Sequence, residues 1–234
     1  MNWKSGAAVA ALGALIGGGA MMLAAPATAP NRGLDTAIRT YILNHPEIIQ
    51  EAADKLQTRA LAKVVDANRS AFESPFAGAW AGNRRGDVTL VEFFDYSCGY
   101  CRTSVPHIDR LLKEDPGLRV VYRELPVLGP DSEAAAFASL AAAAGPNYKR
   151  FHNAMFAAGR PNPATIARVA AANGVAGARP SPEARAEIEN NVALARAAGV
   201  TGTPAFIVGD QVIGSAVGYE ALKRAVAEAR AGRS

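Results

Sequence analysis

The residues best suited to chemistry are two cysteines, Cys98 and Cys101, with only Gly-Tyr between them in the 234-residue chain. This spacing occurs in metal sites, short structural disulfides and redox pairs. A structural zinc site needs four ligands, but the sequence has no second cysteine pair and its three histidines are scattered. A structural disulfide over so short a loop removes little entropy from the unfolded chain. We therefore expect a redox-active disulfide between Cys98 and Cys101, with no metal and no bound cofactor.

The flanking sequence places this pair at the junction of a strand and a helix. VTLVEFF is an apolar run typical of a buried strand, and the helix predicted after it starts at the cysteines. The N-terminus of a helix stabilises a thiolate through unpaired N–H groups and the positive end of the helix dipole. Cys98 is therefore the predicted nucleophile. Cys101, one turn further, is the predicted thiol that attacks a mixed disulfide formed at Cys98.

Glu92 is the charged residue within the predicted strand VTLVEFF. If the strand lies at the edge of a sheet, the carboxylate reaches solvent. If the strand is buried, burial raises the pKa of the carboxyl group, and Glu92 becomes a proton acceptor that assists the deprotonation of Cys101. The residues alone leave both interpretations open.

The N-terminus has the pattern of a secretory signal peptide. Lys4 precedes an uncharged apolar run over 7–25, and small residues follow at positions suited to cleavage after Ala27. We expect residues 1–27 to be a signal peptide, with an uncleaved membrane anchor as the alternative, because about 20 apolar residues span a bilayer. Export to the periplasm would allow disulfide chemistry outside the reducing cytosol. The net charge of +4 is spread along the chain and indicates no nucleic-acid partner.

An N-terminal helical segment is predicted over 31–73. Its first helix covers roughly 35–44, and Pro46 fits the first turn of the second helix. The second helix carries an apolar stripe at three- and four-residue steps. This stripe consists of Ile49, Ala53, Leu56, Ala60 and Val64. The stripe either packs on the rest of the chain or pairs with further copies of the protein. After this segment, a Gly/Pro/Ala-rich linker is predicted over 74–87.

The remaining chain, over 88–230, predicts an α/β domain. A second strand is predicted over 118–126, and the order strand, helix, strand implies a parallel crossover. A block of alanine-rich helices then extends over about 130–198. Two short strands flank the turn-forming pair Gly209-Asp210, and a last helix closes the domain.

Two stretches resemble the DsbA-like thiol–disulfide oxidoreductases. GDVTLVEFFDYSCGYC is similar to the active-site strand of that family, and GVTGTPAFIVGDQVIGSAVGYEAL to the second half of its site. The resemblance implies a thioredoxin fold with an inserted helical subdomain and an N-terminal helical extension, and it places Glu92 where the family has a buried acid. It also implies a cis peptide bond before Pro204 and backbone hydrogen bonds from Thr203 to an extended substrate. The expected substrate-binding residues are Gly202, Thr203, Pro204 and Tyr100.

The dipeptide between the cysteines indicates the subtype. Oxidases of the family commonly carry Pro-His there, whereas Gly-Tyr, together with threonine before the proline, resembles disulfide isomerases and the ScsC-like branch. ILNHPEIIQEA resembles the N-terminal segment of that branch, which implies a dimer or trimer formed through 35–65. The resemblance therefore implies isomerase or reductase character more than pure oxidase character.

The same resemblance implies the partners. The substrates would be unfolded or wrongly disulfide-bonded exported proteins, and a membrane redox partner protein would reset the cysteine pair. The alternative is a periplasmic protein that binds copper(I) on the two soft thiolates, because ScsC-like proteins are associated with copper tolerance.

Overall fold

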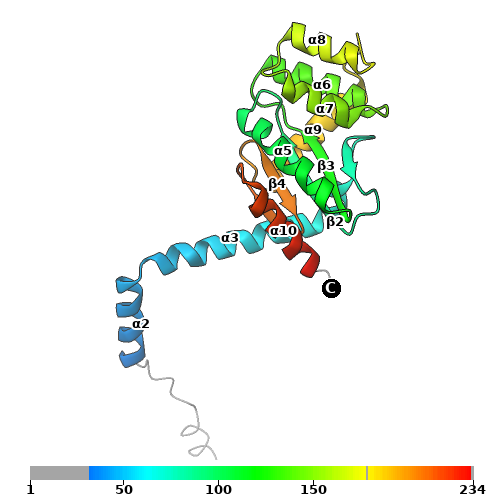
Figure 1. Cartoon of the computed structure of the whole chain (residues 1–234). Coiled ribbons are helices and arrows are strands. Elements are labelled where there is room, and N and C mark those ends of the chain that lie inside the picture. Colours follow the sequence, from blue (N-terminus) through cyan, green and yellow to red (C-terminus); the bar gives the residue numbers. More distant parts are fainter. Residues whose placement is uncertain (1–31, 178, 233–234) are drawn as a thin grey trace, which may run out of the picture. The chain divides into compact units, whose positions relative to one another are not determined.

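The computed structural model describes residues 32–177 and 179–232, which form two compact units that divide between Ala53 and Asp54 (Figure 1). The predicted signal peptide, 1–27, lies outside the described residues. Within the described ranges, no helix is long and apolar enough to cross a membrane.

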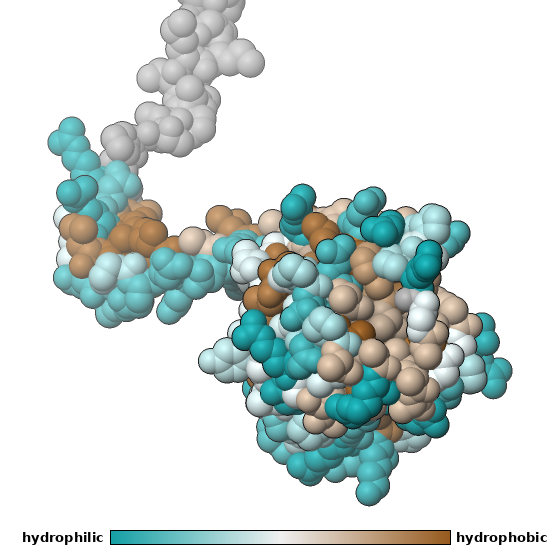
Figure 2. Space-filling model, turned by 90° about the horizontal axis from the view of Figure 1, so that it is seen from above, coloured by the Kyte–Doolittle hydropathy of each residue, from teal (hydrophilic) through white to brown (hydrophobic). Residues whose placement is uncertain are grey.

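The N-terminal unit contains helix α2 (Arg32–Asn44) and the first part of helix α3 (Glu47–Ala67). The two predicted helices are thus present, and Pro46 lies directly before α3. Every residue of α2 is at least partly exposed, and the buried residue of α3, Val65, lies near its C-terminal end. The predicted stripe is exposed over most of its length, for example at Leu56, which is 66% exposed. Figure 2 shows hydrophobic side chains gathered on the surface of the N-terminal unit.

The second unit is built on a five-stranded sheet with the order β1-β3-β2-β4-β5. The strands are β1 (Trp80–Gly82), β2 (Val88–Phe94), β3 (Leu118–Glu124), β4 (Ala205–Val208) and β5 (Gln211–Ile213). β2 and β3 pair in parallel, as predicted, and the other neighbours pair antiparallel. The predicted hairpin turn joins β4 to β5, with Gly209 in the left-handed region at φ 58°. The predicted α/β fold of the thioredoxin type is confirmed.

The stretch 74–87, predicted as a linker, contributes a strand to the sheet. β1 lies within it and pairs antiparallel with β3, with Trp80 opposite Val121. Three residues, WAG, are too few to show an alternating pattern, which is why the sequence did not reveal this strand. A short helix, α4 (Arg69–Glu73), precedes it and buries Phe72 in the core of the second unit.

Helices cover both faces of the sheet (Figure 1). They are α5 (Gly99–Glu114), α6 (Pro130–Ala143), α7 (Tyr148–Ala157), α8 (Pro163–Ala172), α9 (Pro182–Ala197) and α10 (Tyr219–Ala231). Successive residues of a strand point to opposite faces. Leu90 and Phe94 of β2 accordingly join the core with α5, α7 and α10, whereas Val91 and Phe93 join the core with α4 and α9. By the same alternation, Glu92 faces the side that α5 covers.

A buried arginine holds α4 and α9 against the face of the sheet opposite to that of Glu92. Arg123 of β3 is 1% exposed, and its guanidinium donates hydrogen bonds to the carbonyl oxygens of Phe72 at 3.0 Å and Ser74 at 2.8 Å. The same group donates to the side chains of Asn191 at 2.7 Å and Glu187 at 3.1 Å, both on α9. Burial lowers the pKa of Arg123, and the charge of Glu187 opposes this effect. One side chain therefore connects β3 to α4, to the residue after it, and to α9.

Candidate active site

Cys98 lies at the start of α5, just after the end of β2. Its backbone N–H donates to the carbonyl oxygen of Asp95 at 3.0 Å. Its thiol donates to the carbonyl oxygen of Thr203 at 3.3 Å, and the residue is 7% exposed. The structure therefore places the predicted nucleophile at a helix N-terminus and against the predicted substrate-binding loop.

The predicted substrate-binding loop, 202–204, precedes β4, the neighbour of β2 in the sheet. The peptide bond between Thr203 and Pro204 is cis, as the resemblance implies. Gly202 and Thr203 are half-buried and Pro204 is buried. Because β2 and β4 are adjacent and antiparallel, the end of β2 and the start of β4 meet at one edge of the sheet. The structure brings these residues to Cys98, and their binding of a substrate stays a prediction.

Cys101 lies one helical turn further along α5 and is fully buried. Burial raises the pKa of its thiol, and the carboxyl group of Glu92 raises it further, whereas a hydrogen bond with Thr203 acts in the opposite direction. Both cysteines are free thiols. A thiol in these surroundings needs a proton acceptor before it attacks a disulfide, because only the thiolate is the nucleophile.

Glu92 is the group predicted to accept that proton. It lies in β2, which has β3 on one side and β4 on the other, and it is fully buried. The edge-strand interpretation is therefore wrong. The carboxylate oxygens have no hydrogen-bond partner among the described residues. Burial raises the pKa of Glu92 to about 8, while the nearby charge of Lys149 lowers it and those of Asp109 and Cys98 raise it. A pKa close to neutral pH suits a group that takes up and releases a proton.

The loops beside Cys98 contain residues that sequence reasoning missed. Asp95 is buried, and its Oδ2 accepts the backbone N–H groups of Val127 at 2.9 Å and Leu128 at 3.0 Å. Its Oδ1 accepts the N–H of Ser97 at 2.7 Å. An aspartate directly after a strand indicates a role in holding a loop, but the sequence does not reveal partners more than 30 residues away. Tyr100, predicted to bind substrate, is 70% exposed on the first turn of α5.

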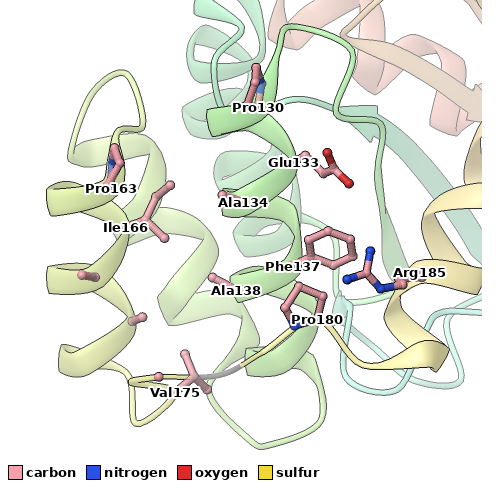
Figure 3. A pocket seen from close by; sticks show the side chains of 13 residues that line it. Pro130, Glu133, Ala134, Phe137, Ala138, Pro163, Ile166, Val175, Pro180 and Arg185 are labelled. Atoms are coloured by element: carbon pink, nitrogen blue, oxygen red, sulfur yellow. The ribbon is translucent and has the colours of Figure 1, made fainter.

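A separate hollow of about 510 Å³ lies between α6, α8 and the chain before α9 (Figure 3). Pro130 and Glu133 line it at the N-terminal end of α6. Phe137 and Arg185 line it further along, with the guanidinium carbon 5.2 Å from the ring centroid. Its described lining residues include neither cysteine nor the loop around Pro204. The hollow is therefore distinct from the thiol site.

The fold and the site together define a class of protein. A Cys-x-x-Cys pair starts a helix after a central strand, and a cis-proline loop contacts the first sulfur. This is the arrangement of thioredoxin-like thiol–disulfide oxidoreductases. Residues 89–227 match the family model of the DSBA-like thioredoxin domain, and the chain belongs to this family. Residues 34–63 match the model of the copper resistance protein ScsC N-terminal domain, so the resemblance to the ScsC-like branch is confirmed.

Solved structures support this assignment. The chain is 40% identical to a thioredoxin-like oxidoreductase from Silicibacter pomeroyi DSS-3, with a TM-score of 0.66 over 70% of this chain and 98% of that chain. It is 28% identical to a periplasmic thioredoxin-like protein from Salmonella enterica serovar Typhimurium, with a TM-score of 0.66 over 70% and 95%. Proteus mirabilis ScsC in a transitional conformation is 25% identical, with a TM-score of 0.69 over 89% and 99%.

Curated relatives include a much longer protein. The chain is 30% identical over 159 residues to Na(+)/H(+) antiporter NhaA 1 of Salinispora arenicola (strain CNS-205). The match covers 64% of this chain and 24% of the antiporter. A second antiporter, NhaA 3 of Salinispora tropica, is 35% identical over 78 residues, which are 32% of this chain and 12% of that protein. The chain thus spans a quarter or less of the length of these relatives.

Proposed function

We propose that this chain is an exported, periplasmic thiol–disulfide oxidoreductase that isomerises or reduces disulfides of protein substrates. The observation that carries the proposal is the thiol of Cys98, at the start of α5 and 3.3 Å from the carbonyl oxygen of Thr203, with Cys101 buried one turn behind it. The periplasmic location is supported by the signal-like N-terminus and by the printed description of the Salmonella relative.

The exchange starts when the Cys98 thiolate attacks one sulfur of a substrate disulfide. The substrate S–S bond breaks, a bond between Cys98 and the substrate forms, and the other substrate sulfur leaves as a thiolate that takes up a proton. Cys101 then gives its proton to Glu92 and attacks the sulfur of Cys98. This step forms the Cys98–Cys101 disulfide and releases the second substrate sulfur, so that two electrons have passed from the protein to the substrate.

Isomerisation follows a shorter route from the same mixed disulfide. A free thiolate of the substrate attacks the substrate sulfur that is bound to Cys98. The substrate then holds a different disulfide, Cys98 is restored as a thiolate, and no electrons are transferred overall. After a net reduction, a membrane redox partner with a dithiol must return two electrons to the Cys98–Cys101 disulfide.

Two features support isomerase or reductase character. The dipeptide between the cysteines is Gly-Tyr, so the chain lacks the histidine that oxidases of the family commonly have directly before the second cysteine, and the tyrosine at that position, Tyr100, is 70% exposed. The exposed apolar residues of α2 and α3, within the part that matches the ScsC N-terminal domain, support self-association into a dimer or trimer. Several copies would then present more than one Cys98 to the same misfolded substrate.

The test compares the refolding of ribonuclease with scrambled disulfides and the oxidation of reduced ribonuclease, both with the full chain. We expect faster recovery of active ribonuclease from the scrambled form than from the reduced form. A matched variant, Ile38→Glu with Leu43→Glu, charges exposed apolar positions of α2 and keeps both cysteines. It is expected to lose self-association and isomerase activity while it still reduces a small disulfide. Oxidation alone, equal in both proteins, would contradict isomerase character.

A second candidate function is copper(I) binding, favoured by the match of residues 34–63 to a domain named for copper resistance. Two thiolates, from Cys98 and Cys101, are the soft ligands that copper(I) prefers. The test is a copper(I) titration of the reduced protein against a competing chelator, with Cys98→Ala as the matched variant. Binding of one ion per chain that the variant loses supports this function, and equal weak binding in both proteins contradicts it.

A further inference from the structure

The hollow between α6 and α8 lies apart from the cysteines, and thiol chemistry gives it no role (Figure 3). It exists because the two helices face each other with alanines. Ala134 and Ala138 line it from α6, and Ala167 and Ala170 line it from α8. A side chain that ends at Cβ leaves the space that a longer one would fill. The volume of about 510 Å³ lies within the range of roughly 300–1,000 Å³ that is typical of small-molecule sites.

The helices around the hollow are held by their own contacts. A hydrogen bond of 2.8 Å between the hydroxyl groups of Ser132 and Ser97 holds the start of α6. The side chain of Asn162 caps α8 by accepting the N–H of Thr165 at 2.9 Å. The shape of the hollow therefore does not depend on a ligand, and a preformed site binds without the cost of ordering its walls.

The surface of the hollow is largely apolar. Ile166 points from α8 towards α6, and Phe137 lies on the side of α9, as Figure 3 shows. Both side chains are partly exposed, as is Val175 in the chain that follows α8. These contacts favour a ligand whose own body is apolar, because its burial removes hydrocarbon surface from water.

Two charged side chains are among the described residues that line the hollow. Arg185, near the start of α9, lies with its guanidinium carbon 5.2 Å from the centre of the Phe137 ring. Glu133 lies one turn before Phe137 on α6. Within the described ranges, neither charge is engaged in an ion pair. An arginine stacked on a ring keeps its N–H groups available at the edge, where they bind a carboxylate with two parallel hydrogen bonds.

The two charges favour an acidic ligand over a basic one. Glu133 lies in the first turn of α6, where the positive end of the helix dipole offsets part of its negative charge. The positive charge of Arg185 is not offset in this way, and its guanidinium is held in place by the ring of Phe137. A carboxylate would therefore bind at Arg185 and be kept away from Glu133, which sets the direction of the ligand in the hollow.

We propose that this hollow binds an amphipathic carboxylate, with the acidic end on Arg185 and an apolar chain along the alanines of α6 and α8. The inference goes beyond thiol–disulfide exchange and does not rest on it, because neither cysteine is among the described residues that line the hollow. Each CH₂ group of the chain that becomes buried corresponds to a gain in affinity of about fourfold.

The experiment titrates the full-length protein by calorimetry with decanoate, octanoate and decyltrimethylammonium, each below the concentration at which it forms micelles. The compounds differ in chain length or in the sign of the charge. We expect decanoate to bind about 4–16-fold more tightly than octanoate, for one or two further buried CH₂ groups. It should also bind more tightly than decyltrimethylammonium. Equal affinities of these two ten-carbon compounds would overturn the acidic ligand, and no binding of any compound would overturn the site.

Charge variants test the contact with the carboxylate. Arg185→Gln is expected to weaken decanoate binding by about fivefold, the upper end for an exposed charge pair. Arg168→Gln is the matched control, because Arg168 is an exposed arginine of α8 outside the lining of the hollow. Glu133→Gln should change the affinity in the opposite direction and strengthen binding. An equal effect of Arg185→Gln and Arg168→Gln would overturn the placement of the carboxylate.

A second pair of variants tests the location, because the exposed apolar side chains of α2 and α3 also attract an apolar chain. Ala167→Trp fills the hollow from α8, whereas Ala164→Trp adds the same side chain to an exposed position outside the lining. We expect decanoate binding to be lost in Ala167→Trp alone, with equal circular dichroism spectra of both proteins. Equal binding by both variants would overturn the site. If Ala167→Trp does not fold, the charge variants decide the proposal.

Discussion

Arg123 and Glu92 lie on neighbouring strands of one sheet, point to opposite faces and are both shut off from solvent. Arg123 donates hydrogen bonds to backbone carbonyls and to side chains of α9. Glu92 has no hydrogen-bond partner among the described residues, although it is equally buried. A buried polar group costs stability unless its hydrogen bonds are made. The face with Arg123 therefore serves stability, whereas the face with Glu92 keeps a destabilising group beside the thiols.

Arg123→Met should have the largest effect. Methionine fills much of the volume but leaves Glu187, Asn191 and the carbonyl of Phe72 without their donor. Loss of one partner from a buried charged network costs about 3–5 kcal/mol, which urea unfolding monitored by circular dichroism will measure. Arg110→Met is the control, because Arg110 pairs with Glu114 on the surface, where water screens the pair, and its loss should cost far less stability. An equal loss of stability in both variants would contradict the stabilising role of the hydrogen bonds of Arg123.

Glu92→Gln should have the opposite effect on stability. The pKa of Glu92 is raised by burial to about 8 in the folded protein, from an ordinary value of 4.5. Between these values the folded protein binds a proton that the unfolded chain does not, so stability falls as pH rises from about 4.5 to about 8. The free energy of unfolding of the variant does not fall in this way. The difference in unfolding free energy between the variant and wild type should therefore shift in favour of the variant by about 3 kcal/mol from pH 4 to pH 7. A pH-independent difference in urea unfolding would contradict the burial of an ionisable group.

The same substitution should slow the second chemical step. A mixed disulfide of Cys98 with thionitrobenzoate releases its chromophore when Cys101 attacks. Without the proton acceptor, this release should slow by about 100-fold, the lower end of the range for general-base catalysis. In wild type the rate should rise with pH towards the pKa of Glu92, about 8. An equal slowing of the first attack by Cys98 would indicate a general distortion of the site instead.

Lys149→Gln should have the smallest effect, a shift of the pH profile without loss of stability. The charge of Lys149 lowers the pKa of Glu92, and its ammonium also pairs with Asp109 at 2.5 Å. Without Lys149, the positive charge that lowers the pKa of Glu92 is absent and the negative charge of Asp109 is no longer balanced by this lysine. The midpoint of the pH profile of chromophore release should therefore move to higher pH. Lys223→Gln, on the exposed surface of helix α10, is the control and should leave the midpoint in place. A shift to lower pH would show that Lys149 does not act on Glu92.

The reactive part of the site could be predicted because its signals are local. Two cysteines after an apolar strand indicate the strand-to-helix junction, and the Thr-Pro pair before AFIV marks the loop that faces it. The position of Glu92 within its strand was also evident. Its burial was not, because the order of strands in a sheet depends on pairings between distant segments, which a pattern of apolar residues does not encode.

The supporting contacts could not be predicted for the same reason. Asp95 binds Val127 and Leu128 across more than 30 residues, and Arg123 binds Asn191 across 68. Nothing in the sequence around Asp95 or Arg123 indicates which distant residue each one binds. β1 was missed for a different reason: its three residues, two of them with small side chains, are too few to show the alternation of apolar and polar residues that indicates a strand. Long-range hydrogen bonds and very short strands are thus the features that only the folded chain reveals.

The burial of Phe72 has a consequence for how this domain is inherited. The family match begins at residue 89, but Val65 and Phe72 belong to the core of the same unit, and Arg123 binds the carbonyl oxygen of Phe72. A gene fragment cut at the start of the match would encode β2 and the cysteines without the residues that complete one face of the sheet. Recombination that moves this domain into another protein must therefore carry the chain from Val65 onward.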